Sequence, residues 1–138
     1  MLASRAPGNP PEPRVATGQN EPMNAPGKPA PASTPPPPYF AVIFSATRDP
    51  QPGDGFAETD ERMFALAAEQ AGFLGYETSG GDGLGITVSY WDSEDAIAAW
   101  KAKTEHVAAQ REGRARWFDS YVVRVARVER AYGFVRST

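Results

Sequence analysis

The sequence of 138 residues has no cysteine and a single histidine, His106. Without cysteine the chain can form no disulfide and carries no thiolate nucleophile. Small secreted proteins often contain disulfides, so their absence favours a cytoplasmic location. One histidine with no second ligand nearby makes a poor metal site. We therefore expect no metal and no cofactor.

Signals of several other function classes are also missing. No apolar run approaches the roughly 20 residues that span a bilayer, and no apolar region follows Arg5 as it would in a secretory signal. The formal charge is −3, with both signs mixed along the chain. The glycines of 79–85 precede no helix and so match no phosphate-binding loop. The sequence also shows no Ser-His-Asp pattern. We expect neither a nucleic acid nor a membrane as partner.

Proline divides the chain into two parts. All of the 14 prolines except Pro50 and Pro52 lie in residues 1–38, a segment without Phe, Trp or Tyr. Such a segment buries too little apolar surface to offset the entropy cost of ordering. The sequence predicts a disordered arm over 1–38 and one folded domain over 39–138. The arm is either a docking segment or a tail without a role.

The folded part shows four strand patterns and two helix patterns. The nearly continuous apolar run YFAVIFSAT is typical of a strand buried on both faces. The turn sequence GGDG joins two strands into a hairpin. Acidic residues suit the first turn of each helix, and Asp92 or Ser93 is the expected cap of the second. The elements expected, in chain order, are strand 39–47, helix 56–70, strand 73–79, strand 84–91, helix 94–111 and strand 117–129.

This β-α-β-β-α-β order predicts an α+β fold, a ferredoxin-like antiparallel sheet with both helices on one face. The other face of the sheet would then be bare, although the first strand is apolar on both sides. A second copy related by a two-fold axis would cover it, so we expect a homodimer.

Residues 89–106 contain the candidate site, because two of the three tryptophans and the only histidine lie there. Ser89 and Trp91 share one face of a strand, and Trp100 lies on the inner stripe of the second helix. The tryptophans are either core or the walls of a pocket for an aromatic molecule. His106 flanks the same stripe, and it is either a solvated or structural histidine or a general base.

Two further residues extend this candidate site. Arg111 continues the inner stripe of the second helix and would bind an anionic substrate oxygen or pair with a carboxylate of the chain. Tyr121 on the last strand is a hydrogen-bond donor to substrate or a residue of the core or interface.

The segments YFAVIFSA, GFLGYET, GITVSYWDSEDAIAAWK and RWFDSYVVRVARVERAYGF resemble the antibiotic biosynthesis monooxygenase family. The resemblance covers nearly all of residues 39–134 and none of the arm. It implies a dimeric α+β barrel with a cavity between each sheet and its helices. Some members of the family oxidise polyaromatic compounds with dioxygen and without metal or flavin, and related barrels degrade haem.

The haem branch is not favoured by the residues present. Its members carry an asparagine on the first strand, a tryptophan on the second helix and a haem-ligating histidine ten residues after that tryptophan. Trp100 matches the tryptophan, but Gln110 stands at the histidine position and the first strand has no asparagine.

The resemblance and the aromatic cluster together predict a cofactor-independent monooxygenase that acts on an aromatic, quinol-type small molecule. In this hypothesis His106 is the base and Arg111 the oxyanion partner, while Trp91, Trp100, Ser89 and Tyr121 bind the substrate. The alternative is a non-catalytic small-molecule binder or a stress-related dimer whose aromatics are plain core.

Overall fold

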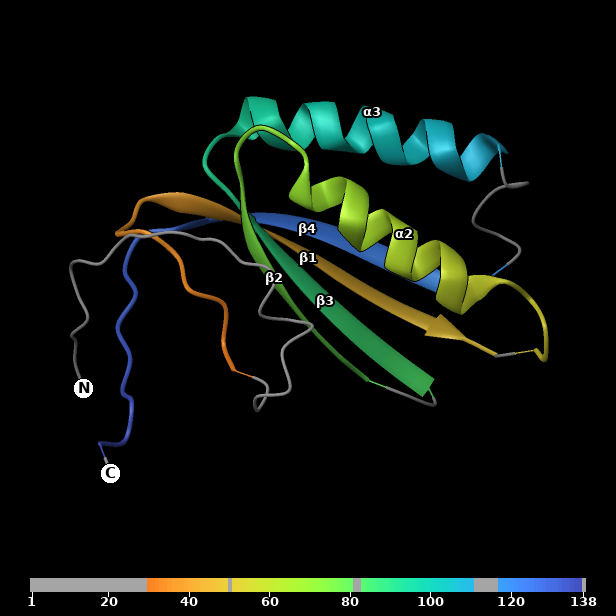
Figure 1. Ribbon diagram of the computed structural model, residues 1–138, viewed down its shortest axis with the longest axis horizontal. Coiled ribbons are helices and arrows are strands. Elements are labelled where there is room, and N and C mark those ends of the chain that lie inside the picture. Colours follow the sequence, from red (N-terminus) through yellow and green to blue (C-terminus); the bar gives the residue numbers. More distant parts are fainter. Residues whose placement is uncertain (1–29, 50, 81–82, 111–116, 138) are drawn as a thin grey trace.

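The computed structural model describes residues 30–49, 51–80, 83–110 and 117–137, with the backbone alone at 106–110. Within these residues a four-stranded antiparallel sheet carries two helices on one face (Figure 1). The elements in chain order are β1 (Tyr39–Arg48), α2 (Phe56–Ala68), β2 (Phe73–Gly80), β3 (Gly83–Trp91), α3 (Glu94–Gln110) and β4 (Ser120–Val128). The expected β-α-β-β-α-β order and the α+β, ferredoxin-like fold are confirmed.

The apolar strand β1 is central, because the sheet order is β2-β3-β1-β4. Residues opposite each other in antiparallel strands share a face of the sheet. Phe40 opposes Trp91 on β3 and Arg127 on β4, and these side chains face the helices. Ala41 opposes Tyr90, and these face the other side, which we call the outer face. The sheet of a single chain is open, so a closed barrel requires a second copy.

Several local contacts explain where the helices begin and end. The Ser93 hydroxyl accepts a hydrogen bond from the Ala96 N–H at 3.1 Å, which makes Ser93 the cap of α3. Helix α2 ends at Ala68, a little before the expected residue 70. Gly72, four residues after the end of this helix, has φ 88° and lies against Asp92 and Ala96, where a Cβ would clash. Within the described residues, no helix combines the length and the apolar character needed to cross a membrane.

The helix-facing side of α2 carries an aromatic pair, and the last strand starts later than the sequence predicts. The inner side of α2 includes Phe64, whose ring stacks on Tyr76 with centroids 4.0 Å apart, and the buried Thr59. The last strand begins at Ser120 rather than at residue 117. Trp117 is buried before the strand, and its indole N–H donates to the Asp54 carbonyl oxygen at 2.9 Å. A buried indole needs such an acceptor, and this one holds Trp117 out of the strand.

Residues 30–38 contact the outer face near the start of β1. The Ala32 N–H donates to a Glu77 carboxylate oxygen at 2.9 Å, and the Thr34 hydroxyl donates to the Tyr39 hydroxyl at 2.9 Å. Glu77 also accepts from the Tyr90 hydroxyl at 2.7 Å. Burial and this hydrogen bond raise the pKa of Tyr90 far above its ordinary value. The body of the fold thus begins before residue 39, while the remainder of the predicted arm, 1–29, lies outside the described residues.

Candidate active site

The two tryptophans of the candidate site pack together between the sheet and α3. Trp91 is 0% exposed, and its ring stacks on Trp100 with centroids 5.8 Å apart and planes at 29°. The indole N–H of Trp91 donates to the Ser89 hydroxyl at 2.9 Å, and Phe73 meets Trp91 edge-on. The structure thus brings Ser89, Trp91 and Trp100 together. Trp91 is fully buried, and its only donor is bonded to Ser89. The half-buried Trp100 is therefore the tryptophan of this pair that a ligand can reach.

Tyr121 lies on the same face of the sheet but at its other end. It opposes Ala46 on β1, whereas Trp91 opposes Phe40. Six residues of strand separate these two positions, a distance of about 20 Å. Tyr121 stacks on Phe44 with centroids 5.3 Å apart and meets Phe118 edge-on. The structure therefore does not join Tyr121 to the tryptophan pair.

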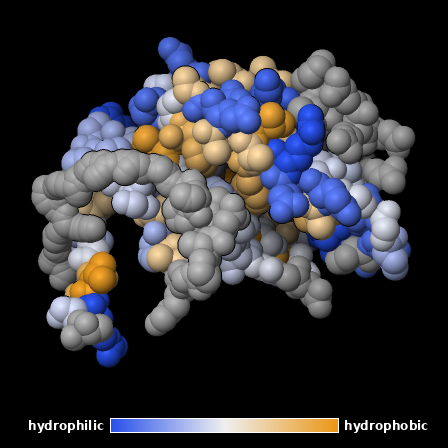
Figure 2. Space-filling view, in the orientation of Figure 1, coloured by the Kyte–Doolittle hydropathy of each residue, from blue (hydrophilic) through white to orange (hydrophobic). Residues whose placement is uncertain are grey.

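Alternate residues of β4 form an exposed apolar strip on the helix-facing side: Tyr121, Val123 and Val125, which are 39%, 48% and 52% exposed. The main helix contacts lie elsewhere, since α2 packs on β2 and α3 packs on β3. Figure 2, in the orientation of Figure 1, shows apolar side chains gathered over the helices in the middle of that view, with hydrophilic residues around them. An apolar molecule would find contact surface on this half of the sheet.

The predicted base and oxyanion partner are not described at the level of side chains. His106 belongs to the last turns of α3, where only the backbone is described, and Arg111 lies outside the described residues. Their roles therefore stay predictions.

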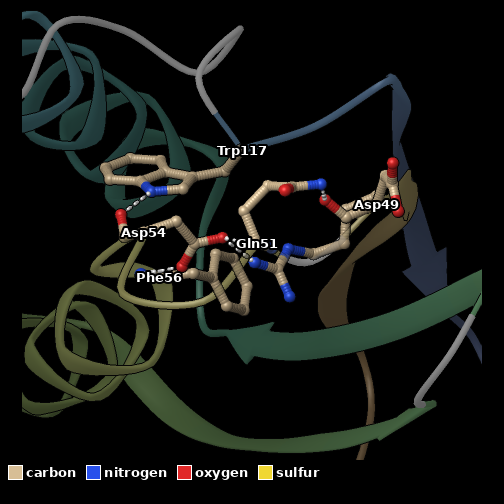
Figure 3. Close-up of polar contacts among 6 residues, drawn as sticks. Asp49, Gln51, Asp54, Phe56 and Trp117 are labelled. Atoms are coloured by element: carbon tan, nitrogen blue, oxygen red, sulfur yellow. Dashed lines mark hydrogen bonds and ion pairs between the residues drawn. The ribbon is translucent and has the colours of Figure 1, made fainter.

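A polar cluster surrounds the start of α2, at the end of the sheet opposite the tryptophans (Figure 3). The Arg48 guanidinium donates to an Asp54 carboxylate oxygen at 2.7 Å and lies 3.7 Å from the centre of the Phe56 ring. The other Asp54 carboxylate oxygen accepts from the Phe56 N–H at 2.9 Å. Asp54 therefore binds the first N–H of the helix and the Arg48 guanidinium at the same time. The Phe56 N–H bond, followed by those of Gln51 and Arg48, lowers the pKa of Asp54.

Asp60 is a second carboxylate near the same arginine, in a different environment. It is half-buried on α2, one turn before Phe64, and so lies on the helix side that packs against Tyr76. Burial raises the pKa of Asp60, and the charge of Arg48 offsets only part of this shift. Burial and the Asp60 charge in turn raise the pKa of Tyr76.

The sequence contains two signals for Asp60. It lies in the first turns of α2, where acidic residues interact favourably with the helix dipole. It is also four residues after Phe56 and four before Phe64, so it falls on their side of the helix. No sequence pattern indicates the position of Arg48, because only the fold brings the end of β1 beneath α2.

One other feature of the surface holds none of the predicted site residues. A shallow depression of about 360 Å³ lies where α2 ends and α3 begins, with Gln70, Asp92 and Asp95 in its lining. Among the described residues no three histidine, cysteine or carboxylate side chains come together as a metal site would require.

Comparison with known proteins gives a family match and similar folds. The profile of the antibiotic biosynthesis monooxygenase family matches residues 40–112. An uncharacterized Bacillus subtilis protein, YqjZ, is 54% identical over 108 residues, which is 78% of this chain and 94% of that protein.

Two solved structures are similar in fold. One is SnoaB, a cofactor-independent oxygenase from Streptomyces nogalater, with a TM-score of 0.50 and 17% identity over 74% of this chain and 97% of that one. The other is PA3566 from Pseudomonas aeruginosa, with a TM-score of 0.49 and 19% identity over 69% of this chain and 96% of that one.

Proposed function

Because the chain belongs to the antibiotic biosynthesis monooxygenase family, we propose that it is a cofactor-independent monooxygenase for an aromatic, quinol-type small molecule. The observation that carries the proposal is the helix-facing side of the sheet. That side of the sheet carries a reachable tryptophan, Trp100, a β4 strip of exposed apolar residues and, at the end opposite the tryptophan, ionisable groups under α2. SnoaB, which has a similar fold, is a cofactor-independent oxygenase.

The reaction requires only that the protein bind the substrate and transfer protons. A base removes a proton from the electron-rich ring system, and the resulting anion gives one electron to dioxygen. The two radicals combine at carbon to form a hydroperoxide, which loses water. In an anthrone, a CH₂ group thereby becomes a carbonyl, with one oxygen atom in the product and the other in water. An apolar site favours the first step by desolvating the reactants and holding them together.

The residues take separate parts in this scheme. Trp100 stacks on the substrate ring. Trp91 stacks on Trp100, and the hydrogen bond to Ser89 fixes Trp91. Tyr121, about 20 Å from the tryptophans along the strands, contacts only the far end of an elongated substrate. His106 is the base and Arg111 the oxyanion partner predicted from the sequence.

A binding protein without catalysis is the second candidate, and one observation favours it. The stacked pairs Phe64–Tyr76 and Trp91–Trp100 fill part of the space between the helices and the sheet. In that case the aromatics serve as core, and a ligand occupies only the exposed strip on β4. The homodimer and the cytoplasmic location belong to both candidates.

Oxygen uptake separates the two candidates. The purified chain, with a chelator and free of flavin, is mixed with a panel of hydroquinones and anthrones in an oxygen electrode. Uptake above the rate without protein supports the monooxygenase. Trp100→Phe, which keeps an aromatic wall, should then raise KM more than it lowers kcat. Binding of the panel without any uptake would leave the binding protein as the better account.

A further inference from the structure

The outer face of the sheet is covered at one end and open at the other. Where β1 starts, residues 30–38 contact this face, and Tyr39 and Ala41 are each only 5% exposed. Toward the end of β1 the same face carries large apolar side chains that no described residue covers. We call these side chains the open patch, and they are Leu84 and Ile86 of β3 and Val122 of β4.

The segment that follows β4, residues 129–137, is also apolar and uncovered, and we call it the β4 extension. All of its residues are exposed, and Tyr132, Phe134 and Val135 are 68%, 79% and 80% exposed. Large apolar side chains that gather on an exposed surface mark a site of contact. In an extended segment alternate residues point to the same side. One side of the β4 extension therefore carries two aromatic rings between two arginines, in the order Arg130, Tyr132, Phe134 and Arg136.

The direction of the β4 extension leads it toward the space in front of the outer face. It starts at the covered end of that face, because Val128 opposes Tyr39. Figure 1 shows it leaving the sheet there and running away from the body on the side opposite the two helices. Residues 129–137 span up to about 30 Å when extended. Two packed sheets lie only about 10 Å apart, so the β4 extension is long enough to reach a second sheet.

We propose that the β4 extension packs on the open patch of a second copy of this chain, and that the second copy does the same in return. A two-fold axis that crosses the strands places the covered end of one outer face over the open end of the other. Tyr132 and Phe134 then lie against the partner's open patch. The inference concerns assembly and holds whether or not the chain is an oxygenase.

Charges at the open end of the outer face match those of the β4 extension. Asp49 follows the last residue of β1, and Asp119 precedes β4, where its N–H donates to the Thr47 carbonyl oxygen at 2.8 Å. Both aspartates are exposed. Arg130 and Arg136 flank the two rings of the β4 extension, so each copy brings basic side chains to an end of its partner that carries carboxylates.

The β4 extension fits the patch of a partner better than the patch of its own chain. Val122 pairs with Ser45, which is six residues after Tyr39 and so about 20 Å along the strand. Tyr132 follows Val128 by only four residues, about 13 Å of extended chain. An extension folded back on its own sheet would leave the Tyr132 ring short of the patch, whereas a partner brings the patch to it.

The first test uses the absence of cysteine from the chain. A tagged chain with Phe134→Cys is mixed with an untagged chain with Leu84→Cys, and a short bismaleimide links the thiols after the subunits have exchanged. We expect a linked product of one tagged and one untagged chain. The matched control replaces Leu84→Cys by Ala102→Cys, at an exposed position of α3, and should give little of this product.

A chain that carries both Leu84→Cys and Phe134→Cys separates the other outcomes. Linking within this chain, with none between the two single variants, would show that the extension lies on its own sheet. No linking in either experiment would show that it packs on neither sheet. Each of these two results overturns the inference.

The second test measures the contribution of the two rings to the dimer by sedimentation equilibrium. The variant Tyr132→Ser with Phe134→Ser removes both rings, and the control, Ala131→Ser with Val135→Ser, changes the opposite side of the β4 extension. We expect the first variant to raise the dissociation constant of the dimer about tenfold or more, and the control to stay close to the parent. A monomeric parent, or equal dissociation constants for the first variant and the parent, would contradict the inference. Neither test involves turnover, so a failure of the oxygenase leaves its result unchanged.

Discussion

The hydroxyl of Ser89 shows how one side chain supports the aromatic site. It is the acceptor for the indole N–H of Trp91, which is fully buried. A buried donor left without an acceptor costs about 1–3 kcal/mol. Ser89 therefore supports the site indirectly, because its hydrogen bond stabilises Trp91, on which Trp100 stacks.

Replacing Ser89 by alanine should lower the free energy of unfolding by about 1–3 kcal/mol. The matched control is Ser79→Ala on β2, at an exposed position where the side chain has no such partner to lose among the described residues. Urea denaturation followed by tryptophan fluorescence measures both. Equal stability of the two variants would contradict the account of the Trp91 contact.

Replacing Asp60 by asparagine should leave the melting temperature at pH 7 unchanged or raise it. Burial raises the pKa of Asp60, so the folded state is favoured while the carboxyl is protonated, and this contribution is lost as the pH rises through the folded-state pKa. At pH 7 the ionised side chain therefore costs stability. Calorimetry against Glu61→Gln tests this, and a loss above about 1 kcal/mol, as for a broken buried pair, would make Asp60 a structural partner of Arg48.

At the scale of elements, the sequence predicted the order and kind of all six helices and strands. Hydrophobic periodicity and turn residues act locally, and both are visible in a single sequence. The start of β4 was not predictable in this way, because Trp117 is held by the Asp54 carbonyl, 63 residues away. The same holds for Asp60, because Arg48, whose charge reaches it, comes from another element. Sequence predicted Ser89, Trp91 and Trp100 as neighbours, but not the distance of Tyr121 along the strands.

The segment before β1 gives a prediction about element boundaries. Removing residues 1–29 should leave the melting temperature unchanged. Removing 1–36 also removes the Ala32 and Thr34 hydrogen bonds and uncovers Tyr39, which is only 5% exposed. Each bond contributes about 0.5–1.5 kcal/mol, so we expect a loss of several degrees. Equal melting temperatures for the two truncations would show that the contacts of 30–38 add nothing.

At the scale of the whole molecule, the outer face exposes large apolar side chains. Leu84, Ile86 and Val122 are 56%, 41% and 49% exposed on it. Burying apolar surface contributes about 25 cal/mol per Å², and a second copy would cover these side chains.

We expect a homodimer at micromolar concentration by light scattering, and Ile86→Lys should convert it to a monomer. Ala102→Lys, on the exposed side of α3, is the control and should remain a dimer. A parent chain that is monomeric at this concentration would contradict the two-fold assembly.

We propose that this chain inserts one atom of dioxygen into an aromatic substrate without a cofactor. The most direct measurement uses isotopically labelled dioxygen with the purified, chelator-treated protein and the anthrone and hydroquinone panel, followed by mass spectrometry of the product. The account predicts one labelled oxygen atom in the carbonyl of the product and the other in water. Product whose new oxygen comes from unlabelled water, or no product at all across the panel, would contradict it.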